Sequence, residues 1–267
     1  MKLDILDISR NKVGEINLPA QFNEGIREDL VRRAFLVLRS NKRQAYGTMS
    51  EAGKRASAKL SKRRRKYRGM YGFGISRTPR KVLSRRGTRM YWVGAVSPNT
   101  VGGRMAHPPK SEKILQKKIN KKERKRAIRI CISATVANDL VRKKGHIMPE
   151  NYPFVLDNKF EDLSGTKELK GALKTFGMEK ELERASNKKI RAGVGKARGR
   201  KYKTKKGPLI VVSKESGIIR AANNIPGIDV VNVKDLNVGV LGGEVPGRLT
   251  LWTANAIQKL GEEKLFR

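Results

Sequence analysis

The sequence has 267 residues, with 61 Lys and Arg against 24 Asp and Glu, so its formal net charge is +37. Its single cysteine excludes a disulfide scaffold and a multi-cysteine zinc site. It has neither an apolar run long enough to cross a membrane nor an apolar signal-peptide region. The single cysteine and the lack of such apolar segments predict a reduced, cytoplasmic protein. So large a positive charge on a compact protein predicts that it binds a polyanion, and nucleic acid is the obvious one.

The first forty residues predict a hairpin followed by an amphipathic helix. Residues 2–8 and 13–18 alternate apolar and polar side chains on either side of a turn at 9–12, which is typical of two paired strands. Apolar residues then recur at helical spacing and predict a helix over residues 24–39 with one buried face.

A strongly basic insertion follows. Residues 39–110 hold 20 Lys and Arg but one acid, Glu51, and only eight Ile, Leu, Val or Phe residues. Fixing 72 backbones costs about 70–140 kcal/mol, which so few apolar side chains cannot offset. Six of the fifteen aromatic residues also lie here, and aromatic rings interleaved with Arg suit RNA. We expect residues 1–40 and 110–267 to form one globular body, and residues 41–109 to form an extended loop that RNA orders.

Within the insertion, one helix is expected. Thr48 to Glu51 has the form of a capping box, and small apolar residues recur every four positions behind it. The pattern predicts a basic helix over residues 49–66. Glycine-rich, extended and irregular chain follows, and it ends at the His-Pro-Pro sequence of residues 107–109 because proline disfavours a helix before it.

Helices and one short strand are expected after the insertion. Ser111 begins a short helix, and a longer one covers residues 120–144. Residues 154–156 form a short apolar strand. Two short helices lie within residues 163–184 and are separated at Gly177.

The last third of the chain predicts the fold class. A second basic run, residues 184–206, has 11 Lys and Arg and no acid. Strands alternate with helices around it, which implies right-handed crossovers. The fold class is therefore α/β, with a mostly parallel sheet flanked by helices and a long extended basic loop inserted after the first helix. The strands are expected at 208–213, 228–233 and 248–252, and the helices at 216–223 and after Thr253.

The sequence predicts neither a nucleotide site nor a reactive thiol. Residues 193–199 contain three glycines, but these lack the G-x-G-x-x-G spacing and the preceding strand that a dinucleotide site needs. Cys131 lies among apolar residues and is expected to be a buried, inert thiol. No cofactor is expected.

The acids and histidines do not suggest catalysis. The acid pairs at 161–162 and 262–263 lie in polar stretches, and we expect both to be solvated. His107 and His146 have no partner that would form a nucleophile and base pair, so they are expected to be structural or to contact RNA. We expect neither catalytic residues nor a metal site, and therefore no enzyme.

Five segments together carry a resemblance to a known family. They are residues 72–80 (GFGISRTPR), 85–90 (RRGTRM), 102–110 (GGRMAHPPK), 189–200 (KIRAGVGKARGR) and 247–253 (GRLTLWT). In this order, and over essentially the whole chain, the sequence resembles the universal ribosomal protein that stands fourth in the large-subunit series. The archaeal and eukaryotic branch of that family is the more similar one.

The resemblance implies a structural protein of the large ribosomal subunit that binds its rRNA. It implies that the inserted loop penetrates the rRNA and helps to form the nascent-peptide exit tunnel. The implied partners are large-subunit rRNA, neighbouring large-subunit proteins and the nascent peptide near the loop tip, in the cytoplasm and without a membrane. Two alternatives remain at this point, an RNA-modifying methyltransferase and a chromatin protein.

The expected rRNA-binding residues are cations and aromatics of the two basic runs. Those of the first run are Lys54, Arg55, Lys62, Arg63, Arg64, Arg65, Lys66, Tyr71, Phe73, Arg77, Arg80, Lys81, Arg85, Arg86, Arg89, Trp92, Arg104 and His107. Those of the second run are Lys188, Lys189, Arg191, Lys196, Arg198, Arg200 and Lys201. Of these, Arg77, Arg80, Arg85, Arg86 and Arg89 are the best candidates for anchoring the loop at the tunnel.

Overall fold

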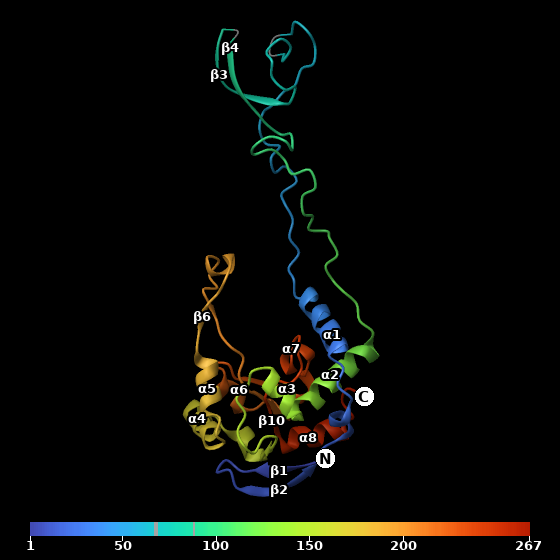
Figure 1. Cartoon of the computed structure of the whole chain (residues 1–267), viewed down its shortest axis with the longest axis vertical. Coiled ribbons are helices and arrows are strands. Elements are labelled where there is room, and N and C mark those ends of the chain that lie inside the picture. The colour runs from blue at the N-terminus through green and yellow to red at the C-terminus, as the bar shows by residue number, and fades with distance from the viewer. Residues whose placement is uncertain (67–68, 88) are drawn as a thin grey trace. The chain divides into compact units, whose positions relative to one another are not determined.

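A computed structural model describes residues 1–66, 69–87 and 89–267. The chain divides into two compact units, which we call the body, Met1–Asn41 with Gln116–Arg267, and the insertion, Lys42–Leu115 (Figure 1). The sequence placed the insertion at residues 41–109, so its observed return to the body comes six residues later. Within the described residues, no helix has both the length and the apolar character that crossing a membrane requires.

The body is built on one six-stranded sheet, in the order β2-β1-β5-β10-β8-β9. Only β1 and β2 pair antiparallel, as the predicted hairpin, and all other neighbours pair in parallel. The predicted α/β class with a mostly parallel sheet is therefore confirmed. The strands are β1 Lys2–Leu6, β2 Lys12–Asn17, β5 Val155–Leu156, β8 Leu209–Val212, β9 Asp229–Asn232 and β10 Thr250–Thr253.

Helices cover both faces of this sheet (Figure 1). They are α1 Glu28–Asn41, α2 Lys121–Val136, α3 Asn138–Lys143, α4 Thr166–Thr175, α5 Glu179–Ser186, α6 Gly217–Ala222, α7 Val238–Leu241 and α8 Ala254–Glu262. Short 3-10 segments lie at Ala20–Asn23, Asn158–Asp162, Val194–Lys196 and Val233–Asp235.

The continuous apolar run in β8 explains why two layers of helices form. Successive side chains of a strand point to opposite faces. Leu209 and Val211 therefore join the apolar cluster of α1, α2, α7 and α8, whereas Ile210 and Val212 join that of α4 and α6. All four are fully buried, as expected for a parallel strand covered on both sides.

Several predicted helix boundaries in the body shift. Helix α1 begins at Glu28, four residues later than expected. The single helix expected over 120–144 is two helices, because Ala137 adopts an extended conformation between them. The predicted break at Gly177, whose φ is +76°, is confirmed.

The prediction of a short helix beginning at Ser111 is wrong. Residues 111–120 contain only a turn, and Ile114 is 87% exposed. Two adjacent apolar residues do not form a stripe that could pack against a neighbour, and packing supplies most of the stability of a short helix.

Two features of the insertion differ from expectation. The prediction of a basic helix over 49–66 is wrong, because residues 50–54 and 64–65 form turns and no described residue of this range is helical. Gly53 has φ +74°, outside the right-handed helical region, and its Cα lies so close to the Arg104 backbone that a Cβ would be 2.5 Å away. The irregular chain expected after it contains an antiparallel hairpin, β3 Arg80–Arg86 with β4 Arg89–Gly94.

Hydrogen bonds between the Asn41 side chain and the Lys117 backbone form a clamp in the body. The clamp joins the two points of the body from which the insertion leaves and to which it returns. The Asn41 side chain accepts a hydrogen bond from the Lys117 N–H at 2.9 Å and donates one to the Lys117 carbonyl at 3.3 Å. Asn41 is the last residue of α1, and Lys117 precedes α2. The clamp therefore fixes the separation of the two points where the body ends and resumes.

Glu161 is buried, so the expectation of a solvated acid pair at 161–162 is wrong for its first member. Its carboxylate accepts hydrogen bonds from Ser213 N–H at 2.9 Å, Ser213 Oγ at 2.8 Å and Thr253 Oγ1 at 2.6 Å. These donors lie where β8 and β10 end, so Glu161 ties the two strands together. Asp162 and the pair at 262–263 are exposed, as expected.

Replacing Glu161 with Ala should lower the free energy of unfolding by about 2–4 kcal/mol, because buried donors on Ser213 and Thr253 lose their acceptor. Urea denaturation of the full chain measures this. The control is Asp162→Ala, which removes an exposed carboxylate and should change stability by about 0.5 kcal/mol or less. Equal effects of the two substitutions would contradict the structural role of Glu161.

Candidate nucleic-acid interface

The insertion carries positive charge that the protein itself does not neutralise. Arg85 aside, the Lys and Arg side chains described in residues 42–115 form no ion pair with a carboxylate. In the body, by contrast, Glu24 pairs with Arg126 at 2.9 Å and with Arg129 at 2.8 Å. The acids of this protein thus compensate body cations and leave those of the insertion open to an external anion.

None of the 25 residues expected to bind rRNA is buried. Tyr71, Arg80, Trp92, Arg104 and Arg191 are half-buried, and the other twenty are exposed. They lie on two basic surfaces, the insertion (residues 54–66 and the part from Tyr71 through β4 to His107) and the second basic run. Every one of them is therefore accessible to a large ligand.

The β3–β4 hairpin places like charges directly opposite each other. Arg86 pairs with Arg89 across the two strands, beside the pair of Arg85 with Met90. Like charges in direct cross-strand positions are destabilising. A phosphate between the arginines would turn this repulsion into attraction, so the end of the hairpin has the electrostatics of an anion-binding surface.

Aromatic side chains of the insertion contact cations and one another. The Arg77 guanidinium lies 4.5 Å from the centroid of the Tyr71 ring, and its Nη1 donates a hydrogen bond to the Tyr71 hydroxyl at 3.3 Å. Phe73 and Trp92 form an edge-to-face pair with centroids 6.2 Å apart, and Phe73 is 62% exposed. Exposed rings and guanidinium planes are what unpaired RNA bases stack on.

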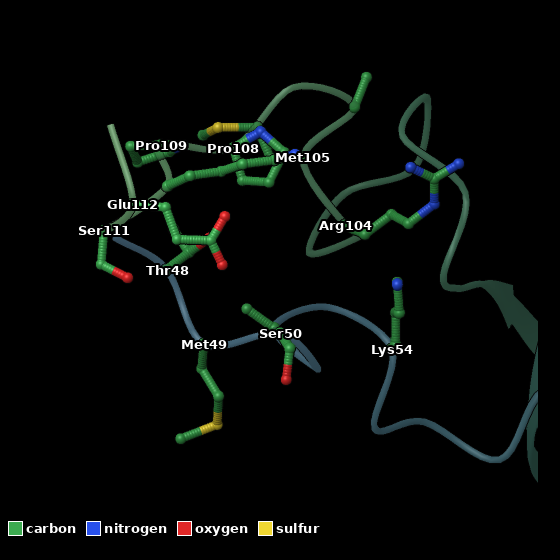
Figure 2. Close-up of a pocket in the computed structure, with 13 residues that line it drawn as sticks. Thr48, Met49, Ser50, Lys54, Arg104, Met105, Pro108, Pro109, Ser111 and Glu112 are labelled. Atoms are coloured by element: carbon green, nitrogen blue, oxygen red, sulfur yellow. The ribbon is translucent and has the colours of Figure 1, made fainter. Parts of the chain in front are cut away.

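The two arms of the insertion meet at a pocket of about 460 Å³ (Figure 2). The Thr48 N–H donates to the Pro109 carbonyl at 3.0 Å and joins the arms. Lys54 and Arg104 lie at one end of the pocket, and Glu112 lies toward the other. Two cations from separate arms therefore come together, which their positions in the sequence do not show. His107 is exposed and does not line this pocket.

Residues 188–206 of the second basic run form a narrow arm of the body. Strands β6 Lys189–Ile190 and β7 Tyr202–Lys203 pair antiparallel. Arg191 bonds across the arm, because its Nε donates to the Arg200 carbonyl at 3.0 Å and its Nη2 to that of Tyr202 at 3.3 Å. Arg191 thus stiffens the arm. The expected contact residues left exposed on it are Lys188, Lys189, Lys196, Arg198, Arg200 and Lys201.

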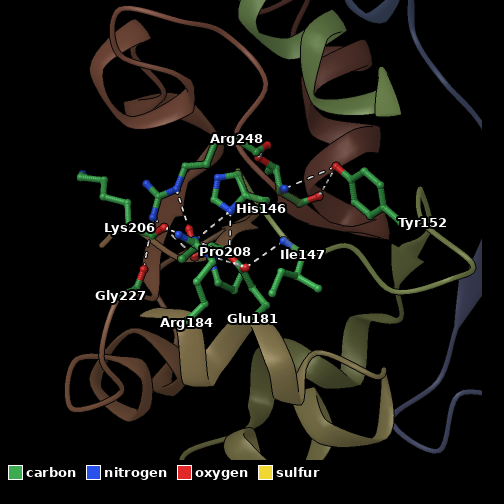
Figure 3. A network of polar contacts seen from close by, with 11 residues as sticks. His146, Ile147, Tyr152, Glu181, Arg184, Lys206, Pro208, Gly227 and Arg248 are labelled. Atoms are coloured by element: carbon green, nitrogen blue, oxygen red, sulfur yellow. Dashed lines mark hydrogen bonds and ion pairs between the residues drawn. The ribbon is translucent and has the colours of Figure 1, made fainter. Parts of the chain in front are cut away.

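A buried polar network holds the base of this arm (Figure 3). Glu181 accepts hydrogen bonds from Arg184 Nε and Nη2, both at 2.7 Å, from the Ile147 N–H at 3.0 Å, and from His146, whose Nδ1 lies 2.7 Å away. Arg184 Nη2 also donates to the Lys206 carbonyl at 2.7 Å. The first and last residues of the basic run are therefore bonded to each other.

Arg248 fixes the same end of the arm from the other side. Its Nε donates to the Gly207 carbonyl at 3.0 Å, and its Nη1 pairs with Asp229 at 2.7 Å. Burial works against ionisation of Asp229, but the charge and hydrogen bonds of Arg248 and Lys206 outweigh it and hold the pKa of Asp229 below its usual value. A buried framework thus positions the solvent-exposed arm.

The structure also places the remaining reactive residues. His146 is buried against Glu181 and is structural, one of the two roles expected for it. Cys131 is fully buried, and burial raises the pKa of its thiol to about 12, so the expectation of an inert thiol is confirmed. Across the described ranges, no three His, Cys, Asp or Glu side chains come together as a metal site would require.

Sequence reasoning missed a third basic surface. Residues 117–129 hold eight Lys and Arg and one acid, Glu123, and most of them lie in the first turns of α2. Cations are unfavourable near a helix N-terminus, where the helix dipole is positive. Counted by themselves, these residues show a clear excess of positive charge. The excess is not visible in the sum over the whole body, which is nearly neutral. Its exposed cations without an ion pair in the described structure are Lys117, Lys118, Lys121, Lys122 and Arg124.

An α/β body with solvent-exposed, acid-poor basic surfaces defines a protein of the nucleic-acid-binding class. The family model described as "Ribosomal protein L4/L1 family" matches residues 16–263, and the chain belongs to this family. The chain is 48% identical to the large ribosomal subunit protein uL4 of Nanoarchaeum equitans over the full length of both. It is 41% identical to uL4 of Archaeoglobus fulgidus, over 98% of this chain and 99% of the relative, and 42% identical to uL4 of Methanocaldococcus jannaschii, over 98% and 99%.

The network at the base of the arm predicts a pH-dependent stability. Burial opposes ionisation of Glu181, but hydrogen bonds from Arg184, His146 and the Ile147 N–H outweigh it and hold the pKa of Glu181 below its usual value. The carboxylate therefore stabilises the fold above its unfolded-state pKa, and this contribution is lost as the pH falls through the folded-state pKa. Glu181→Gln should cost about 3 kcal/mol at neutral pH, because the half-buried Arg184 loses the buried carboxylate with which it pairs.

Chemical denaturation of both proteins at pH 7 and at about pH 3.5 measures this effect. The difference between wild type and Glu181→Gln should shrink at the lower pH, because that pH lies below the pKa of a glutamate in the unfolded chain. The exposed neighbour Glu183→Gln is the matched control and should be neutral at both values. A difference that does not change with pH would rule out a charge-dependent role for Glu181.

Proposed function

We propose that this chain is a structural component of the large ribosomal subunit that binds large-subunit rRNA through its three basic surfaces. The surfaces are the insertion, the arm at 188–206 and the start of α2. The observation that carries the proposal is the set of exposed cations without carboxylate partners on these segments, in a chain whose relatives are named as large-subunit proteins. Neighbouring large-subunit proteins are further partners, and the ribosome places the protein in the cytoplasm.

Charge neutralisation and stacking are the physical basis of this binding. Each Lys or Arg that contacts a phosphate releases condensed counterions, which favours association. The rings of Tyr71, Phe73 and Trp92 add stacking with unpaired bases, which depends little on sequence. The protein positions and neutralises folded RNA and carries out no covalent chemistry.

The roles of the buried acids support a structural function over an enzymatic one. Glu161 and Glu181 are fully occupied in tying strands and the base of the arm together. The names of the relatives favour rRNA over the methyltransferase and chromatin alternatives. Titration with folded large-subunit rRNA and with duplex DNA of equal phosphate content distinguishes the two nucleic-acid partners, and tighter binding of the DNA would contradict the proposal.

The salt dependence of rRNA binding tests the surface at 54–66. Replacing Arg63, Arg64 and Arg65 with Gln should flatten the slope of log K against log[salt] by about two to three units, if each neutralises one phosphate. The control replaces Lys12, Lys143 and Lys174 with Gln, which removes the same charge from body cations that already pair with acids. The control slope should stay within one unit of wild type. Equal flattening in both variants would mean that only net charge matters.

We further propose that the β3–β4 hairpin lies at the constriction of the nascent-peptide exit tunnel, with the nascent peptide as a partner. The family resemblance of residues 72–80 and 85–90 suggests this position, and the opposed Arg86 and Arg89 would there contact rRNA phosphates. The hairpin presents no acid, so it suits a site whose walls are RNA.

Deleting residues 80–94 tests the tunnel role. The Ala95 N–H donates to the Pro79 carbonyl at 2.8 Å, so a linker of a few Gly and Ser residues can replace the hairpin with little strain. Subunits should still incorporate the variant, because the other basic surfaces remain. Elongation through the tunnel, or sensitivity to drugs that bind it, should change. Normal elongation of every test peptide with normal drug sensitivity would exclude the tunnel role and leave rRNA binding intact.

A further inference from the structure

A second pocket of the insertion combines one aromatic ring, apolar walls and cations. Its volume is about 610 Å³, within the usual range for small-ligand sites. Among the described residues, no carboxylate lines it. Its lining residues are Ser57, Lys59, Leu60, Ser61, Lys66, Arg80, Val82 and Trp92.

The aromatic side of the pocket is rigidly placed. Trp92 lies on β4 directly opposite Val82 on β3, and both line the pocket. The edge-to-face contact with Phe73, at an interplanar angle of 80°, restrains the indole ring. Leu60 adds an apolar neighbour from the preceding segment. A flat ring in an apolar setting is a stacking platform for a base.

The cationic side holds a donor that has no acceptor. Arg80 Nη2 donates to the Ser76 carbonyl at 3.1 Å and to Ser76 Oγ at 2.9 Å, which orients the guanidinium. Arg80 Nε is buried and has no hydrogen-bond partner among the described residues. An unsatisfied buried donor is destabilising, and an incoming oxygen would satisfy it. Lys59 is joined to Arg80 by a backbone bridge, so a second cation is held beside it.

We propose that this pocket binds one unstacked nucleotide of single-stranded RNA, with the base on Trp92 and the phosphate at Arg80, Lys59 and Lys66. The inference rests on the proposed function and makes it specific to one site. A base inside a duplex cannot reach a recessed ring, whereas an extruded base can be stacked and its phosphate neutralised at once. The pocket thus selects unpaired RNA, while the open basic surfaces bind any phosphate backbone.

Tryptophan fluorescence of the full chain tests the proposal directly. The chain has two tryptophans, and Trp252 is only 2% exposed in the body, so quenching by a ligand that stacks reports on Trp92. The probes are a mixed-sequence RNA hexanucleotide that cannot pair with itself and a 12-base-pair RNA duplex, at equal phosphate concentration and about 150 mM salt. The hexanucleotide should quench the emission, and the duplex should bind, by anisotropy, without comparable quenching.

Variants assign the binding to the pocket. Trp92→Leu should weaken hexanucleotide binding about 5-fold to 100-fold, measured by anisotropy of a labelled strand, because stacking is lost. Trp92→Phe keeps a ring and should recover most of the affinity. Tyr91→Leu is the matched control, since Tyr91 is adjacent on β4, 55% exposed and outside the pocket lining, and it should bind as wild type does. Arg80→Gln should weaken binding more than Arg89→Gln, which removes the same charge outside the pocket.

Three results would overturn the proposal: equal quenching by the duplex, equal losses in Trp92→Leu and Tyr91→Leu, or no loss in Trp92→Leu. Titration of the same proteins with large-subunit rRNA distinguishes a failure of the pocket proposal from a failure of the proposed function. If the protein binds rRNA in a salt-dependent way but the hexanucleotide does not quench the tryptophan emission, the pocket proposal is refuted and the proposed function stands. If the wild-type protein does not bind large-subunit rRNA, both the pocket proposal and the proposed function are refuted.

Discussion

Unpaired positive charge on exposed segments is the constraint on which the rest of this structure depends. The chain has far fewer acids than cations, and it uses those acids almost entirely in the body. Glu24, Glu181 and Asp229 neutralise cations that support helices and the base of the basic arm. The insertion receives no such compensation, Arg85 aside, in the residues that the structure describes. Its arginines repel one another unless phosphates lie among them.

The body therefore acts as a rigid base from which the exposed basic segments extend. Two apolar layers on either side of a parallel sheet supply its stability, and polar contacts fix where the basic segments leave it. Asn41 clamps Lys117 at the ends of the insertion, and Arg184 bonds the end of the arm near Lys206. Both contacts use backbone carbonyls or amides as partners, so they set the path of the chain. Accurate positioning of flexible cations on RNA requires such fixed ends.

The insertion itself is organised by local contacts. Its buried apolar residues are few, with Met70 and Ala95 among the described ones, so no extended core holds it. Turns, the β3–β4 hairpin and close approaches such as Gly53 to Arg104 give it shape instead. The same hairpin forms a wall of the pocket at Trp92. A segment of this kind can follow an irregular RNA surface and still present a few rigid features to it.

Local pattern alone determined the class of fold and the location of the charge. The apolar run at 208–213 required a strand buried on both faces, and Gly177 required a helix break, because these depend on residues adjacent in sequence. The two acid-poor runs were visible by counting. Tertiary structure decided everything that depends on partners distant in sequence. Glu161 is buried only because the ends of β8 and β10 supply donors, which no neighbour in the sequence reveals.

The same distinction explains the interface. The identities of the candidate contact residues followed from composition, since Lys, Arg and aromatic rings are what phosphates and bases require. Their grouping did not follow, because Arg80, Lys59 and Trp92 meet through a hairpin and a backbone bridge between segments that are separate in sequence. The helix expected over 49–66 failed for a related reason, since close contact with Arg104 holds Gly53 in a non-helical conformation. The sequence by itself determined the chemistry of this surface, and only the tertiary structure decided its shape, because shape depends on contacts between distant residues.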